Sequence, residues 1–284
     1  MHSDEATSNI RQVEQLMLDL VLRSGGEAGK AAAYHLSAGG SRVRALLALD
    51  AARALARPDR EAIAIAAACE LLHNASLVHD DLQDRDVHRR GRDAVWRRYG
   101  DAAAICAGDL LLSAAYAAMA TTGATASLLI TRMHHRVSAV IGGQCEDIAL
   151  QGSTLSSLET YEHVARAKSG PLLVLPIELA LVLAGCEDAV ATAVEAGSLF
   201  AVGYQITDDL DDVQRDAVSG ELNIVAVLAA SGETRPQACA RDLAICRFRQ
   251  AHAVAIALPE GCGALLAAHA LRRSAALSAT LETA

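Results

Sequence analysis

Aromatic side chains are scarce in this sequence: they make up 3% of its 284 residues, although 52% of the residues are hydrophobic. Strands are typically rich in aromatic and β-branched residues, whereas alanine, which is frequent throughout this chain, favours closely packed helices. The composition therefore predicts an all-α protein. Because the composition is uniform from end to end, we expect residues 1–284 to form a single domain.

A CxxC cysteine pair and a positive net charge are also missing. The seven cysteines form no CxxC pair and are odd in number, which argues against a disulfide framework and favours reduced thiols buried among alanines. The net charge of −9 argues against a nucleic-acid partner. The first five residues lack the basic and then apolar profile of a secretory signal, so we expect a cytoplasmic protein.

A long uncharged stretch covers residues 110–131. It is long enough to cross a bilayer, but it is rich in Ala, Ser and Thr and is interrupted by Thr121-Thr122-Gly123. This pattern favours a buried helix followed by a turn. We therefore expect no stable insertion into a membrane.

Apolar residues recur at helical spacing along most of the chain, and glycine, proline and Ser-Gly signals separate the segments. We expect helices within residues 10–21, 41–57, 59–84, 101–120, 125–151, 155–184, 187–216, 234–257 and 261–281. Pro171 falls inside one of them. A proline there bends the helix and would turn Lys168 and Ser169 toward a cavity.

Two acidic clusters of the same spacing interrupt two apolar helical stretches: Asp80-Asp81-Leu82-Gln83-Asp84 and Asp208-Asp209-Leu210-Asp211-Asp212. On a helix, residues four apart share a face and the next residue lies about 100° round. Like charges at this spacing repel, so a cation should compensate them. Carboxylate oxygens suit magnesium, which keeps several waters and binds substrate phosphates. We predict that Asp80, Asp81 and Asp84, and likewise Asp208, Asp209 and Asp212, bind magnesium; the alternative is a pair of solvated acidic helix faces.

Several further motifs occur in a fixed order around these clusters. They are Gly39-Gly40-Ser41-Arg42-Val43-Arg44, Glu70-Leu71-Leu72-His73, Arg89-Arg90-Gly91, Ala107-Gly108-Asp109, Gly143-Gln144, Lys168-Ser169 and Gln205. With these motifs the chain resembles the trans-isoprenyl diphosphate synthases, also called polyprenyl synthetases, over nearly its whole length.

The resemblance implies an orthogonal all-α bundle with a central cavity, in which the two acidic clusters face each other and hold three Mg²⁺ ions around an allylic diphosphate. It implies a prenyltransferase that ionises this substrate and joins it to isopentenyl diphosphate. It also implies a homodimer.

Roles for single residues follow from the same resemblance. Arg89 and Lys168 would hold the allylic diphosphate, and Arg44, His73 and Arg90 would hold the diphosphate of isopentenyl diphosphate. Ser169 and Gln205 resemble the polar lining near the carbocation.

The chain departs from the family pattern at its cations. Ser41 stands where the family carries a lysine, Glu221 lies in a shortened loop after the second cluster where lysines are usual, and no lysine follows Lys168. This pattern is compatible with weaker binding of isopentenyl diphosphate, with Arg42 as a replacement cation, or with a different fate for the carbocation.

Product length in this family depends on the residues four and five positions before the first cluster. Here they are the small residues Ser76 and Ala75, which resemble enzymes with products longer than fifteen carbons. We expect geranylgeranyl diphosphate, with Tyr116 and Met119 as candidates for a deeper floor of the pocket; the alternative for both is core packing.

Two other functions remain open at this point. A terpene synthase of the same fold would act on a finished prenyl diphosphate, and the missing lysines favour it, whereas the intact second aspartate cluster and the scarce aromatics argue against it. A non-catalytic subunit of a heteromeric prenyltransferase usually loses an acidic cluster, and both are present here.

Overall fold

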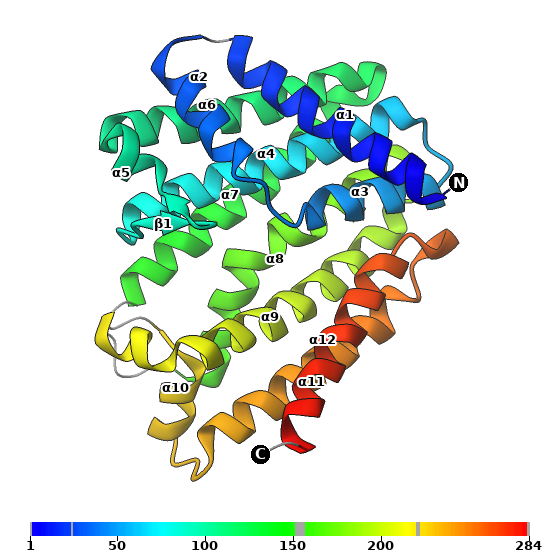
Figure 1. The fold of residues 1–284 in the computed structure, drawn as a ribbon. Helices are drawn as coiled ribbons and strands as arrows, with labels where there is room; N and C mark the ends of the chain where they lie inside the picture. The colour runs from blue at the N-terminus through cyan, green and yellow to red at the C-terminus, as the bar shows by residue number, and fades with distance from the viewer. Residues whose placement is uncertain (1, 24, 151–156, 220–221, 283–284) are drawn as a thin grey trace. The chain divides into compact units, whose positions relative to one another are not determined.

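The computed structural model describes residues 2–23, 25–150, 157–219 and 222–282 (Figure 1). Helices form almost all of this part of the chain, and its only strands are β1 (His88–Arg89) and β2 (Arg92–Asp93), which pair antiparallel. The prediction of an all-α protein is therefore confirmed. Backbone contacts divide the chain into two units, Met1–Met133 with Leu179–Gly185, and His134–Glu178 with Cys186–Ala284. That the units form one domain around a cavity stays a prediction.

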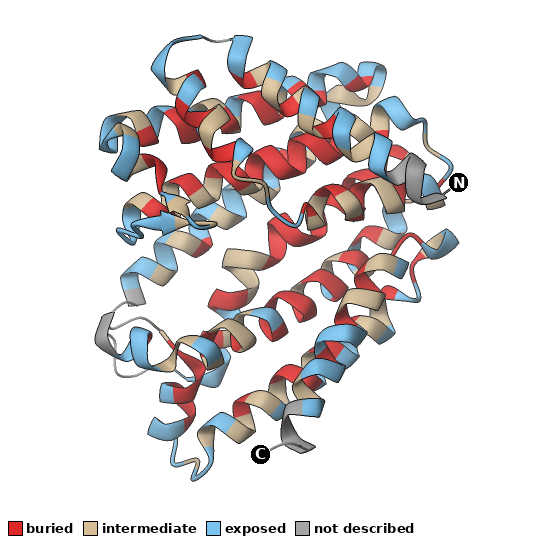
Figure 2. Cartoon of the chain, in the orientation of Figure 1, coloured by how far each residue is buried: buried red, intermediate tan, exposed pale blue. Residues whose placement is uncertain are grey.

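The first unit is built around one long helix. Its helices are α1 (His2–Arg23), α2 (Gly26–Ser37), α3 (Val43–Ala54), α4 (Asp59–Gln83), α5 (Val95–Tyr99), α6 (Asp101–Met119) and the 3-10 helix η1 (Ala120–Thr125). Helix α4 packs against α1, α3 and α6, and most of its residues are buried (Figure 2). The run Ala66-Ala67-Ala68 is completely buried, because alanine lets neighbouring helices approach closely.

Two helices pass from one unit to the other, α7 (Ala126–Leu150) and α8 (Leu158–Leu183). The second unit continues with η2 (Glu187–Ala189), α9 (Val190–Ser219), α10 (Ile224–Ala230), α11 (Pro236–Ala255), η3 (Pro259–Gly261) and α12 (Ala264–Glu282). Helix α11 packs against both α9 and α12. Phe200 of α9 and Phe248 of α11 meet edge to face with ring centroids 5.2 Å apart, an arrangement that the aromatic quadrupole favours.

The expected helices after the first agree with the structure to within about three residues at each end, whereas the first, expected over 10–21, lies inside α1, which begins at His2. The short helices α2, α5 and α10 were not among the expected segments. The helix α6 ends at Met119 and η1 follows it, with Gly123 at φ 74°, so the expected turn near residue 122 is confirmed. Pro171 and Pro176 both lie within α8.

The prediction of buried cysteines is wrong for most of them. Cys69 and Cys262 are buried, Cys186 and Cys239 are half-buried, and Cys106, Cys145 and Cys246 are exposed. Alanine-rich flanking sequence did not determine burial, because each thiol's exposure depends on the side of the helix that it occupies. All seven are free thiols, as expected.

Three helical stretches in the described residues are long and apolar enough to cross a membrane: Asp59–Gln83, Asp101–Ala149 and Glu187–Ala217. In the folded protein, 72%, 44% and 56% of their apolar windows are buried. Packing against neighbouring helices therefore accounts for much of their apolar surface.

Candidate functional site

The first acidic cluster occupies the C-terminal end of α4. Asp81 is completely buried, with 0% of its side chain exposed, whereas Asp80 is half-buried and Asp84 is exposed. Asp84 is the C-cap residue of α4, and its backbone N–H donates to the Asp80 carbonyl at 2.8 Å. The cluster therefore presents two aspartates toward solvent and turns the third into the protein.

Arg89 binds the inward-facing aspartate. Its Nε donates to Asp81 Oδ1 at 2.7 Å, its Nη2 also contacts Asp81, and Nη2 lies 3.3 Å from Asp86 Oδ2. Burial raises the pKa of Asp81, and the hydrogen bond from Arg89 opposes that effect. Asp81 therefore acts within this unit as the anchor of the hairpin that carries Arg89.

Arg90, the next residue, points toward the glycine-rich segment before α3. Its Nη1 donates to the Gly39 carbonyl and lies 3.4 Å from Asn74 Oδ1. A Cβ at Gly40 would lie 2.9 Å from the Arg90 guanidinium carbon, and Gly40 has φ 137°. The backbone conformation therefore favours glycine at position 40, and a side chain there would also displace the Arg90 guanidinium.

Three residues expected to bind isopentenyl diphosphate lie together in the first unit. Burial and then the charges of Arg44 and Arg90 lower the pKa of His73 well below its usual value. Nearby, burial and Arg90 lower the pKa of His35 to about 4, and its Nε2 lies 3.1 Å from Asn74 Oδ1. Both imidazoles are therefore neutral at pH 7, in a positive field that would attract an anion.

Arg42 is occupied by partners inside the protein. The side chain is 8% exposed, and its Nε donates to Glu14 Oε1 at 2.9 Å while its Nη2 donates to the Leu36 carbonyl at 3.2 Å. Glu70, whose Oε2 lies 4.0 Å from Arg42 Nη1, also accepts the backbone N–H of Ala45 in the first turn of α3. These contacts favour a structural role for Arg42. Ser41 beside it is exposed.

The second acidic cluster lies on α9 and repeats the pattern of the first. Asp209 is 2% exposed, Asp208 and Asp212 are half-buried, and Asp211 is exposed. Gln205 Nε2 donates to Asp209 Oδ1 at 2.9 Å, and the backbone N–H of Ile224 donates to Asp209 Oδ2 at 2.8 Å. As in the first cluster, protein donors therefore bind the middle aspartate.

Asn223 joins the second cluster to α10. Its side chain accepts the backbone N–H of Val225 at 2.9 Å and so caps that helix. Its Nδ2 lies 2.8 Å from both the Asp209 carbonyl and Asp216 Oδ2. Asp209 and Asn223 thus fix the start of α10 on α9, and Glu221 of the preceding loop lies outside the described residues.

Burial of the second cluster makes its negative charge costly. Burial raises the pKa of Asp208 to about 7 despite the opposing charge of Arg273, and it raises the pKa of Asp209 to about 6 despite the hydrogen bond from Gln205. A cation beside Asp208 would favour its ionised form.

That all six aspartates of the two clusters bind magnesium stays a prediction. Asp80 and Asp84, and Asp208 and Asp212, are spaced four residues apart and offer oxygen ligands only. In the described ranges no three His, Cys, Asp or Glu side chains are grouped closely enough to hold a metal ion.

Lys168 and Ser169 lie on α8. Lys168 Nζ donates to Asp147 Oδ2 of α7 at 2.7 Å, and Ser169 is half-buried. A Cβ at Gly143 of α7 would lie 2.8 Å from the Lys168 backbone nitrogen. The glycine of Gly143-Gln144 therefore allows α7 and α8 to approach closely next to Lys168.

The four residues considered for product length lie on two helices that pack together, α4 and α6. Ala75 and Met119 are buried, whereas Ser76 and Tyr116 are half-buried. Ser76 Oγ donates to the His73 carbonyl at 2.9 Å. Complete burial of Met119 is what core packing requires, and the half-buried Tyr116 is the better placed of the two to meet a ligand.

Sequence reasoning did not identify Asn223 or Tyr161. Asn223 stands directly before the apolar run Ile224–Leu228, which is a sequence signal for a helix cap. Tyr161 is buried, and burial together with the Asp209 charge raises its pKa well above the usual value. No pattern in the sequence links Tyr161 to the acidic cluster.

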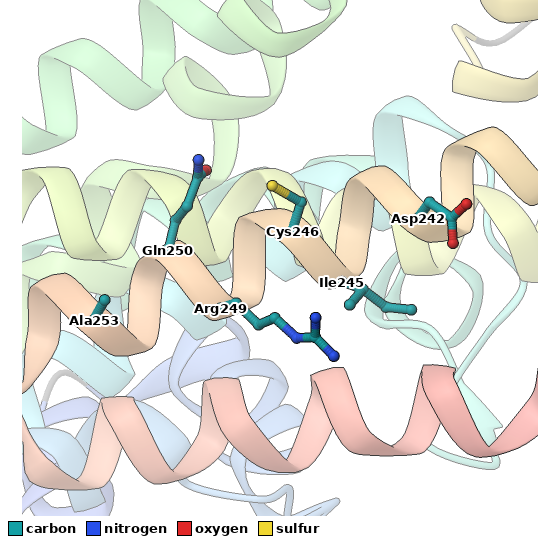
Figure 3. A pocket seen from close by; sticks show the side chains of 6 residues that line it. All are labelled: Asp242, Ile245, Cys246, Arg249, Gln250 and Ala253. Carbon is teal, nitrogen blue, oxygen red and sulfur yellow. The ribbon is translucent and has the colours of Figure 1, made fainter.

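A pocket of about 480 Å³ lies along α11 (Figure 3). It is lined by Asp242, Ile245, Cys246, Arg249, Gln250 and Ala253. In the close-up view Cys246 and Gln250 point away from the side toward which Arg249 extends. None of the predicted site residues lines it.

Residues 27–221 match the sequence profile of the polyprenyl synthetase family. Because the match covers more than half of the chain, the protein belongs to this family. The chain is 35% identical over 173 residues to a (2E,6E)-farnesyl diphosphate synthase of Mycobacterium tuberculosis, covering 60% of this chain and 48% of that protein. It is 32% identical over 188 residues to a geranylgeranyl pyrophosphate synthase of Geoglobus acetivorans, covering 65% of this chain and 59% of the relative. The matches thus span about half the length of these relatives.

The structure is similar to that of a decaprenyl diphosphate synthase from Rhodobacter capsulatus, with a TM-score of 0.87 and 20% sequence identity. The likeness covers 97% of this chain and 98% of the other. The two chains therefore share an all-α fold.

Proposed function

We propose that this protein is a trans-prenyltransferase that condenses isopentenyl diphosphate with an allylic prenyl diphosphate. The observation that carries the proposal is the shared design of the two acidic clusters. In each cluster the buried middle aspartate, Asp81 or Asp209, accepts hydrogen bonds from the protein. The two aspartates four residues apart are more exposed: these are Asp80 with Asp84, and Asp208 with Asp212. The printed activities of the relatives, farnesyl and geranylgeranyl diphosphate synthases, support the same reaction class.

Magnesium, when bound, would supply Lewis acidity that draws off the allylic diphosphate as a leaving group. The carboxylates of the two pairs, Asp80 with Asp84 and Asp208 with Asp212, would hold the magnesium ions. Lys168 and Arg89 would bind the allylic diphosphate, because ammonium and guanidinium groups donate strong charge-assisted hydrogen bonds to phosphate oxygens. Asp147 and Asp81, their partners in the structure, would orient them.

The diphosphate of isopentenyl diphosphate would bind to Arg44, His73 and Arg90. A neutral His73 can donate one hydrogen bond to a phosphate oxygen, and the two arginines supply the charge. Ser169 and Gln205 would line the space near the carbocation as polar groups. Gln205 already donates to Asp209, so its carbonyl oxygen is the part that is left to face the cation.

Geranylgeranyl diphosphate is the product that we propose. Ala75 and Ser76 are small, which leaves room for a growing chain beside α4. Replacing Ala75 with Phe should shorten the product, measured by mass spectrometry of the dephosphorylated alcohols. An unchanged product length would place the floor elsewhere, and Tyr116→Ala would then be the next variant.

Three further properties belong to this proposal and rest on the family resemblance: three Mg²⁺ ions per active site, a homodimer, and a soluble cytoplasmic protein that forms one domain. Analytical ultracentrifugation of the purified protein tests the dimer directly.

Alanine replacement of the outward-facing aspartates tests the proposed reaction. Asp80→Ala and Asp208→Ala should each abolish magnesium-dependent turnover while the helical circular dichroism signal persists. Asp211→Ala is the matched control, because Asp211 is exposed within the same cluster and has no assigned role. Turnover that survives Asp80→Ala and Asp208→Ala would contradict the metal assignment, and a magnesium-dependent turnover by the isolated wild-type protein would exclude a purely non-catalytic subunit.

A further inference from the structure

Arg273 of α12 lies beside the face of α9 that carries the second acidic cluster. Its guanidinium carbon is 5.1 Å from the centroid of the Tyr204 ring. Tyr204 precedes Asp208 by four residues on α9, and residues four apart share one face of a helix. Arg273 is therefore held next to the face that presents Asp208 and Asp212.

The side chain of Arg273 is accessible to a ligand. Arg273 itself is exposed. Within the residues that the structure describes, it takes part in no hydrogen bond or ion pair, only in the contact with Tyr204. Its N–H donors are therefore available to an anion.

The other cations near the second cluster in the sequence are fewer than the family pattern would supply. No lysine follows Lys168, and Arg215 on α9 is paired with Asp212 at 2.9 Å. A guanidinium matches two phosphate oxygens at once through parallel N–H donors. Stacking on a tyrosine ring also limits the freedom that the arginine would lose on binding.

We propose that Arg273 binds the diphosphate oxygens of the allylic substrate where the second acidic cluster holds them. The assignment rests on the proposed prenyltransferase function and adds a substrate-binding residue to it. Arg273 would thereby supply, from the last helix, the positive charge that the shortened loop after the cluster does not carry.

A purely electrostatic role is the alternative. If Arg273 only offsets the charge of Asp208, magnesium would take over that role on binding, and removal of Arg273 would leave diphosphate binding unchanged or make it tighter. The two roles therefore predict opposite results for the same variant.

Titration calorimetry with inorganic pyrophosphate and excess Mg²⁺ separates them. Arg273→Gln should weaken pyrophosphate binding about tenfold, a loss of about 1.4 kcal/mol, and Arg273→Lys should recover part of it. Arg272→Gln is the matched control, because Arg272 is exposed on the same turn, and it should bind within about twofold of wild type. Binding by Arg273→Gln that equals or exceeds wild type would overturn the assignment.

Steady-state kinetics identify which diphosphate Arg273 contacts. Arg273→Gln should raise the KM for the allylic diphosphate severalfold and leave the KM for isopentenyl diphosphate nearly unchanged. A rise confined to isopentenyl diphosphate would overturn the assignment to the allylic site. If wild-type protein binds no pyrophosphate with Mg²⁺, the proposed function fails, whereas normal wild-type binding with an unaffected Arg273→Gln variant contradicts only the role of Arg273.

Discussion

Arg89 donates from Nε to Oδ1 of the completely buried Asp81 at 2.7 Å. This pair ties the short hairpin after α4 to the helix itself. It also separates the roles of adjacent aspartates: Asp81 holds the hairpin, and Asp80 beside it remains on the side that would meet a metal ion.

Replacing Asp81 with Asn should lower the free energy of unfolding by about 2 kcal/mol, because removal of one partner leaves the Arg89 charge without its buried carboxylate. Urea unfolding followed by circular dichroism measures the loss. The exposed Asp84 gives the matched control, and Asp84→Asn should change stability by less than about 0.5 kcal/mol. Equal stability of both variants would show that the pair does not anchor the hairpin.

Tyr34 of α2 provides a second attachment for the same hairpin. Its ring lies 4.2 Å from the guanidinium carbon of Arg92 and 4.5 Å from that of Arg98, and its hydroxyl donates to the Asp93 carbonyl at 2.9 Å. Tyr34→Phe removes one hydrogen bond and should cost about 1 kcal/mol. Tyr34→Leu also removes the ring and should destabilise further. Hydrogen exchange at residues 88–93 should accelerate in that order, and unchanged exchange in both variants would rule out this positioning role.

Asn223→Ala should cost about 2 kcal/mol of stability, because it removes the cap of α10 and the donors to the Asp209 carbonyl and to Asp216. The matched control is Gln214→Ala, since Gln214 is an exposed amide on α9. Thermal and urea unfolding measure both variants. A control that loses as much stability as Asn223→Ala would contradict the specific role of the cap.

The buried His35 should make stability depend on pH. Its pKa is lowered to about 4 in the folded protein, against about 6.5 when unfolded, so the unfolded chain binds more protons between these values. Its contribution is complete above pH 6.5 and is lost as pH falls toward 4, on the order of 3 kcal/mol.

A variant with a neutral amide at this position isolates that effect. His35→Gln should lose less stability than wild type over the same pH range, measured by urea unfolding at several pH values. His73 also has a lowered pKa, so part of the acid sensitivity should remain. An identical pH dependence for the two proteins would contradict the role of His35.

Much of the fold follows from local sequence patterns. The boundaries of α4 and α6 follow from an apolar helical period that ends at clear breaks. Helix α2 was not predicted because Gly26 and Gly29 reduce its helix propensity. Packing against α1 and α6 stabilises this helix in the folded protein. Helix α10 is short and depends on Asp209 and Asn223, which are contacts that a local pattern does not reveal.

The sequence indicated the candidate site residues, but it did not indicate the hydrogen-bond partners of each residue. Spacing identified both acidic clusters, but it gave Asp81 and Asp209 the same role as their neighbours. The hydrogen bonds that Asp81 accepts from Arg89 and Asp209 accepts from the backbone of Ile224 depend on tertiary structure, and the magnesium role of both aspartates stays a prediction. No sequence motif identifies Arg273, because its contact with Tyr204 depends on how α12 packs in the folded protein.

The central claim is condensation of two diphosphates, and one incubation tests it most directly. Purified protein is mixed with Mg²⁺ and farnesyl diphosphate, with and without isopentenyl diphosphate, and the products are measured by mass spectrometry. We expect a longer prenyl diphosphate, of twenty carbons, that forms only when isopentenyl diphosphate is present. A hydrocarbon or alcohol formed without isopentenyl diphosphate would contradict the claim and identify a terpene synthase instead.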